Sequence, residues 1–199
     1  MINNIKKVKY QLALINLNNS LTDRTQIPYL CIMLMRWIRN FFFWLYAKRQ
    51  GKLRKQITPV SIQEAKCIGI LFSATNHHDN EVIVAYCQRL KQQRKQVELM
   101  AYLPKREFGD KLPFEYFTNW LGKANNANID RFIKTHFDIL INFQVKAKLP
   151  LEYIAVANKA QYKVSFSPDI DIANYDLILI SKENSDIANA IKNLEKYLQ

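Results

Sequence analysis

Residues 66–72 have the sequence KCIGILF, and residues 137–143 have the sequence FDILINF. Both stretches are short and almost continuously apolar, which is typical of strands that are covered on both faces. A helical pattern follows each of them, over residues 81–94 after the first and over residues 149–160 after the second. Strands that alternate with helices in this way predict an α/β fold with a mostly parallel sheet between two helical layers.

The same pattern continues along the chain. It predicts further strands over residues 97–103, 114–120, 162–166 and 175–180, and further helices over residues 128–135 and 184–198. We therefore expect a three-layer Rossmann-like α/β domain over residues 58–199. A weakly structured extension over residues 1–32 and a basic-aromatic N-terminal helix within residues 33–57 precede it. Met33 and Met35 are alternatives to Met1 as the start of translation, and the sequence does not choose between them.

Charge is distributed unevenly over the 199 residues. Residues 1–66 hold 12 Lys and Arg against 2 Asp and Glu, a net charge of +10, whereas residues 67–199 hold 17 against 15, a net charge of +2. A strongly basic leader before a nearly neutral domain indicates contact with nucleic acid or with an acidic membrane surface. Three cysteines without a C-x-x-C pair, and no convincing secretory signal, predict a cytoplasmic protein without a disulfide framework.

The basic-aromatic helix has the sequence RWIRNFFFWLYAKRQGKLRK over residues 36–55. A membrane span is marginal, because Arg36 and Arg39 each cost about 2.5–3.5 kcal/mol at the bilayer centre and each Leu, Ile or Phe returns only about 0.3–0.6 kcal/mol. A helix that lies in the membrane interface is the more favourable arrangement. We expect its contacts to come from Arg36, Trp37, Arg39, Phe41, Trp44, Lys48, Arg49, Lys52, Arg54 and Lys55. The same side chains could bind RNA or the ribosome, or pack onto the α/β domain or a partner helix.

A ligand site is expected outside the carboxyl ends of the strands, as in other open α/β sheets. The candidate residues are Thr75, Asn76, His77 and Asp79 in the loop after the first strand, together with Asn142 at the end of FDILINF. The alternative is a polar loop and helix cap, with Asn142 satisfying loop backbone. The four glycines stand too far apart for a Walker loop or a dinucleotide turn, and no catalytic residues, metal site or cofactor can be identified.

Four sequence blocks follow the basic leader in a characteristic order: K-x-I-G-I-L-F-x-A-T from Lys66, F-D-I-L-I-N from Phe137, P-L-x-Y-I-A from Pro150 and A-x-Y-K-V from Ala160. In combination they resemble a bacterial domain family of unknown function over about residues 35–198. That resemblance implies a fold and a cytosolic or inner-membrane setting, and no reaction. Residues 138–165 are more weakly similar to the acceptor-side half of heptosyltransferase-like glycosyltransferases.

Three functional hypotheses follow. The first is a non-enzymatic α/β module attached peripherally to the cytoplasmic face of the inner membrane through the basic-aromatic helix. The second is an RNA- or ribosome-associated factor that uses the same segment. The third is a small nucleotide-binding or degenerate glycosyltransferase-like enzyme that acts at the loop after the first strand.

Overall fold

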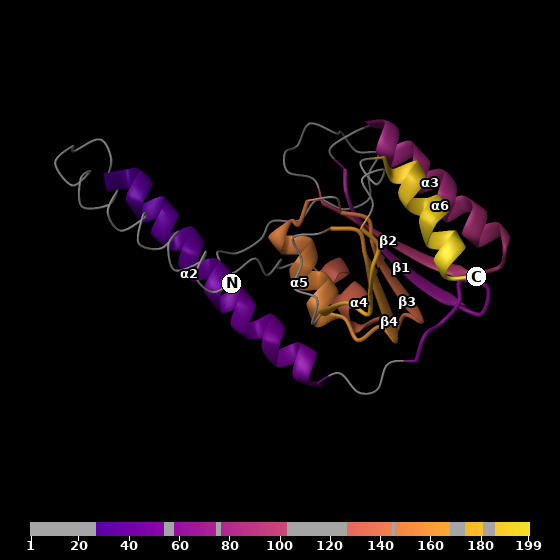
Figure 1. Ribbon diagram of the computed structural model, residues 1–199, viewed down its shortest axis with the longest axis horizontal. Coiled ribbons are helices and arrows are strands. Elements are labelled where there is room, and N and C mark those ends of the chain that lie inside the picture. Colours follow the sequence, from indigo (N-terminus) through magenta and orange to yellow (C-terminus); the bar gives the residue numbers. More distant parts are fainter. Residues whose placement is uncertain are drawn as a thin grey trace. The chain divides into compact units, whose positions relative to one another are not determined.

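The computed structural model of the chain describes residues 27–53, 58–74, 77–102, 127–144, 146–167, 174–180 and 186–199 (Figure 1). Its helices are α2 (Ile27–Leu53), α3 (His77–Gln92), α4 (Ala127–Lys134), α5 (Leu149–Ala157) and α6 (Ile187–Tyr197). Its strands are β1 (Cys67–Ser73), β2 (Gln96–Tyr102), β3 (Ile139–Asn142), β4 (Tyr162–Ser165) and β5 (Leu177–Ile178).

The strands form one parallel sheet in the order β2-β1-β3-β4-β5. The α/β fold with a parallel sheet is thus confirmed. This strand order is the doubly wound order found in flavodoxin-like folds, in which the direction of winding reverses between β1 and β3. At that point Leu71 of β1 stands beside Asn142 of β3 in the register of the sheet.

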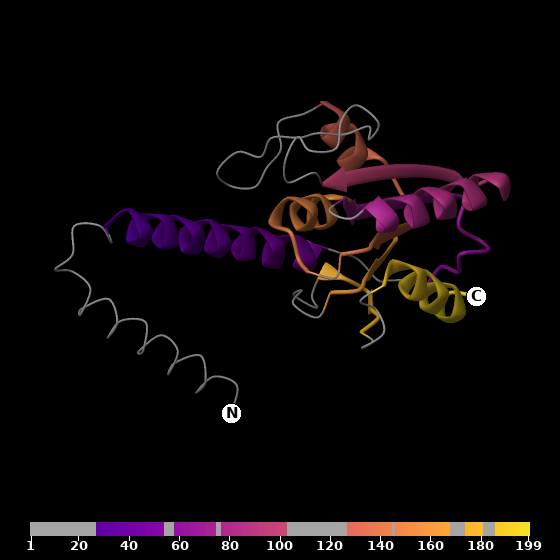
Figure 2. The same ribbon diagram turned by 90° about the horizontal axis from the view of Figure 1, so that it is seen from above.

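Helices cover both faces of the sheet, with α3 and α6 on one face and α4 and α5 on the other (Figures 1 and 2). Alternate residues of β1 serve the two layers: Ile68, Ile70 and Phe72 belong to the core under α3 and α6, whereas Leu71 belongs to the core under α4 and α5. This division follows from the alternation of side chains along a strand. Both faces are apolar because both are covered.

The apolar run of β1 is interrupted by Gly69, because the space beside this residue leaves no room for a side chain. A Cβ atom at this position would lie 2.8 Å from two ring carbons of Phe137 and 2.9 Å from Leu140. The absence of a side chain therefore lets the Phe137 ring pack directly against the strand, where Phe137 is fully buried. The close approach is a packing requirement of the sheet and not a phosphate-binding feature.

Most predicted elements agree with the structure to within a few residues, and three differences matter. The helix α3 begins at His77 and not at residue 81, so His77 and Asp79 belong to its first turn. The helix α2 begins at Ile27, inside the predicted extension, whose residues 1–26 lie outside the described residues. The predicted strand over residues 114–120 also lies outside them.

The helix α2 crosses the boundary between two compact units, Met1–Phe42 and Phe43–Gln199. Its first part, Ile27–Phe42, and its second part, Phe43–Leu53, therefore belong to different units. Within the described part of the chain, no helix is both long enough and apolar enough to cross a membrane.

Candidate functional site

The most unusual surface in the described residues is the apolar side of α2. Its exposed large apolar side chains are Met33, Leu34, Met35, Trp37, Phe41, Phe42, Trp44 and Leu45. Trp37, Phe41 and Trp44 are separated by four and three residues, a spacing that places them on one helix face. We call these three residues the aromatic ladder. Trp37 is 53% exposed and Trp44 is 43% exposed, a large amount of apolar surface to leave in water.

The side chains of the aromatic ladder contact one another and a neighbouring lysine. The Trp37 and Phe41 rings are stacked, with centroids 5.7 Å apart and an interplanar angle of 13°. Lys48 lies four residues after Trp44, and its Nζ stands 4.7 Å from the centroid of the Trp44 ring. Lys48 and its neighbour Arg49 are exposed. The exposed face of the helix therefore ends in a cation, Lys48, that stands directly beside the Trp44 ring, with the exposed Arg49 next to it in sequence.

The opposite side of the second part of α2 is packed. Phe43, Tyr46 and Gln50 are partly buried and Ala47 is only 2% exposed, a spacing of three, four and seven residues that marks a buried helical stripe. Tyr46 stacks on Tyr153 of α5, with ring centroids 5.2 Å apart and an interplanar angle of 14°. Tyr46 thus packs onto the α/β domain, and Phe43 lies in the same stripe.

The remaining predicted contact residues divide into two groups. Arg39 is partly buried, and its Nε has no hydrogen-bond partner in the structure. The side chains of Arg36 and Lys52, and all of Arg54 and Lys55, lie outside the described residues. Of the predicted set, Trp37 and Phe41 are thus exposed in the first unit, and Trp44, Lys48 and Arg49 are exposed in the second.

The predicted ligand loop after β1 is described only at its ends, because Thr75 and Asn76 lie outside the described residues. His77 is exposed, and its Nδ1 lies 3.3 Å from Oε1 of Glu81, also exposed, one turn along α3. Asp79 is partly buried in the same turn. Two atoms that flank the loop, Ser73 Oγ and Asn80 Oδ1, are buried without a hydrogen-bond partner in the structure.

The last of the predicted ligand residues, Asn142, is enclosed within the fold. It is fully buried and belongs to a polar network with Gln144, Glu152 of α5 and Tyr175. Asn142 Nδ2 donates to Glu152 Oε1 at 2.9 Å and to the Tyr175 hydroxyl at 2.6 Å. Gln144 Nε2 donates to the same Glu152 oxygen at 2.9 Å, and the Tyr175 hydroxyl donates to Glu152 Oε2 at 2.9 Å. We call these four residues the Glu152 network.

Burial governs the chemistry of this network. Burial raises the pKa of Glu152 to about 7, while hydrogen bonds from Tyr175, Asn142 and Gln144 oppose that rise by stabilising the carboxylate. Burial also raises the pKa of Tyr175 well above its usual range. Three donors therefore converge on one carboxylate that exchanges its proton near neutral pH.

Sequence reasoning missed Gln144, Glu152 and Tyr175. The signal was present at Glu152, the single charged residue in the otherwise apolar helix LPLEYIAVA. A second such signal is Lys163 in the strand YKVS, which is 1% exposed and whose Nζ donates to the Ala155 carbonyl at 2.6 Å. A charged residue inside a doubly covered layer must find polar partners within the fold.

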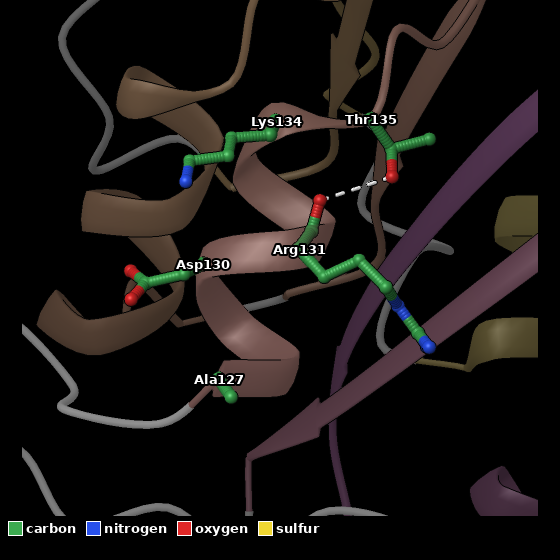
Figure 3. A pocket seen from close by; sticks show the side chains of 5 residues that line it. All are labelled: Ala127, Asp130, Arg131, Lys134 and Thr135. Atoms are coloured by element: carbon green, nitrogen blue, oxygen red, sulfur yellow. Dashed lines mark hydrogen bonds between the residues drawn. The ribbon is translucent and has the colours of Figure 1, made fainter.

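Two cavities lie beside α4. The larger, of about 540 Å³, is lined by Ala127, Asp130, Arg131, Lys134 and Thr135. Figure 3 shows Asp130 and Lys134 on one side of the helix and Arg131 and Thr135 on the other, where Thr135 Oγ1 donates to the Arg131 carbonyl at 3.0 Å. The smaller, of about 300 Å³, lies between the start of α4 and β2. Neither is lined by a predicted ligand residue or by the Glu152 network. No group of three His, Cys, Asp or Glu within the described ranges could hold a metal ion.

The family model of DUF6913, a family of unknown function, matches residues 39–199. The chain belongs to the DUF6913 family. The match confirms the resemblance to a domain family of unknown function, and it includes Trp44, Tyr46 and Lys48 of α2 as well as the whole sheet. No curated protein and no solved structure matches the chain. The similarity of residues 138–165 to heptosyltransferase-like glycosyltransferases is therefore not shown.

Proposed function

We propose that this DUF6913 protein is an α/β module that binds the anionic, cytoplasmic face of the inner membrane through α2. One observation carries the proposal: the aromatic ladder is exposed along a helix face that ends in Lys48 and Arg49. Aromatic rings favour the interface of a bilayer, and neighbouring cations are attracted to anionic headgroups.

The side chains around the ladder favour lipid over RNA as the partner. Bases stack on aromatic rings and phosphates pair with cations, so the ladder and Lys48 alone would suit either. Met33, Leu34 and Leu45 are aliphatic and are 73%, 58% and 42% exposed. Aliphatic chains offer no ring on which a base can stack, but they partition into the acyl boundary of a membrane. This apolar surround supports a lipid surface.

Vesicle flotation of the full chain after nuclease treatment tests the proposal. We expect the protein to float with vesicles rich in phosphatidylglycerol and to float poorly with phosphatidylcholine alone. Changing Lys48, Arg49, Lys52, Arg54 and Lys55 to Gln should abolish most of this preference, because each cation near an anionic surface contributes about 1 kcal/mol. High salt should act in the same direction by screening.

A ladder variant separates the apolar contribution from the charge contribution. Changing Trp37, Phe41 and Trp44 to Ala should weaken flotation about tenfold or more and leave its salt dependence unchanged. The matched control changes Ile180 and Tyr197 to Ala, which are 67% and 63% exposed on the α/β domain, and should float like the wild type. Wild-type protein that binds RNA but fails to float once nuclease has removed it would refute the membrane proposal.

A further inference from the structure

The second part of α2 presents two opposite faces within one compact unit. The stripe of Phe43, Tyr46, Ala47 and Gln50 is partly or fully buried, and its Tyr46 ring stacks on Tyr153 of the α/β domain, whereas Trp44 and Lys48 are exposed. Rotation of this part of the helix about its own axis would separate the Tyr46 and Tyr153 rings. While the stack is formed, Trp44 and Lys48 lie on the side of the helix away from Tyr153.

The Tyr46–Tyr153 pair is the best-defined contact of the packed side. The rings are nearly parallel, and Tyr153 lies in the middle of α5. Burial, the neighbouring Tyr153 phenol and a side-chain hydrogen bond with Tyr153 together raise the pKa of Tyr46 to about 12. The Tyr46 phenol therefore stays neutral at physiological pH, and the contact combines ring stacking with a side-chain hydrogen bond.

We infer that the Tyr46–Tyr153 stack is a joint that orients the α/β domain on an anionic lipid surface. The inference rests on the proposed function. Because Tyr46 faces α5, the exposed Trp44 and Lys48 point away from α5, and the bilayer that receives them lies on the α5 side of the domain. The helices α3 and α6 cover the other face of the sheet, so they are turned toward the cytoplasm (Figure 1). Tyr46 and Tyr153 are positioning residues in this arrangement.

Energy transfer from a donor on the protein to acceptor-labelled lipids measures this orientation. Single cysteines replace Lys159, which is exposed just after α5, or Gln88, which is exposed on α3. A Cys31→Ser background removes one native thiol, and burial raises the pKa of the Cys67 and Cys87 thiols, which makes both poor nucleophiles near neutral pH. On vesicles rich in phosphatidylglycerol we expect stronger transfer from position 159 than from position 88.

Variants of the joint decide whether the stack sets the orientation. Tyr153→Ala should float like the wild type and lose the difference in transfer between the two positions. Tyr153→Phe keeps the stacked ring and should retain that difference. Tyr46→Ala removes the same contact from the other side and should repeat the result of Tyr153→Ala, with the circular dichroism of each variant showing that the domain is folded.

The outcomes distinguish a failure of the orientation by the Tyr46–Tyr153 stack from a failure of the proposed membrane binding. Equal transfer from both positions in floating wild-type protein, or an unchanged difference in Tyr153→Ala and Tyr46→Ala, would overturn the joint and leave membrane binding standing. Wild-type protein that does not float would overturn the proposed function and the joint with it.

Discussion

The aromatic ladder of α2 and the Glu152 network depart from the usual distribution of side chains in opposite directions. Trp37 and Trp44 leave about half of their surface in water, whereas Asn142 and Gln144 are almost completely buried. The buried polar atoms partner one another, so the network needs nothing outside the fold. The ladder gains little from the fold and points to a surface outside it. Under the proposed function the exposed apolar groups meet a lipid surface, whereas the buried polar groups stabilise the fold.

Removing the carboxylate should have the largest effect on stability. Glu152→Ala takes the acceptor from three buried donors and leaves a cavity under α5. We expect the free energy of unfolding to fall by about 3 to 5 kcal/mol, measured by urea denaturation of the full chain. The control is Glu81→Ala, an exposed glutamate of α3, which should change it by at most about 0.5 kcal/mol. Equal effects of the two substitutions would show that the network does not hold α5 to β3.

The pH dependence of stability should be the next largest effect. Burial raises the pKa of Glu152 from an ordinary 4.5 to about 7, so between these values the folded state binds more protons than the unfolded state. The free energy of unfolding should therefore decrease as pH rises, by about 2 to 3 kcal/mol between about pH 5 and about pH 8.

Glu152→Gln isolates this contribution, because every other titrating group is common to both proteins. We expect the variant to lose that decrease when urea denaturation is repeated across the pH range. A parallel pH profile for the variant and the wild type would mean that Glu152 does not carry the dependence.

Periodicity and apolar runs were enough to predict most of the fold. KCIGILF and FDILINF are continuous apolar strands because helices cover both faces of the sheet. A strand that is buried on both faces needs apolar residues at nearly every position, so its sequence alone reveals it. The polar network could not be placed in the same way. Asn142, Glu152 and Tyr175 stand 10 and 23 residues apart along the chain, and only the sheet brings them together. The sequence marks Glu152 as unusual without indicating its partners.

For α2 too, the sequence predicts which residues are unusual but not which other residues they contact. The aromatic and basic residues predicted a contact surface, but the composition of the segment does not distinguish a ring that faces water from one that packs. Tyr46 lies on the packed stripe because its ring stacks on Tyr153 of α5, a contact across more than 100 residues. Which face of an aromatic helix is free depends on the element that it meets.

The smallest expected effects on stability come from two neighbouring rings on different faces of α2, Tyr46 and Trp44. Their comparison distinguishes a packed ring from one that is proposed to contact the membrane. Tyr46→Ala removes a partly buried ring and its stack on Tyr153, so the free energy of unfolding should fall by about 1 to 2 kcal/mol. Trp44→Ala removes a larger ring, but that ring is 43% exposed and its contact with Lys48 lies at the surface, and the higher helix propensity of Ala offsets part of the loss. Its effect should be at most about 0.5 kcal/mol in the same urea denaturation. Vesicle flotation should reverse the order, with Trp44→Ala the weaker binder. If Trp44→Ala destabilises the fold as much as Tyr46→Ala does, the ladder is part of the core and the contact surface must lie elsewhere.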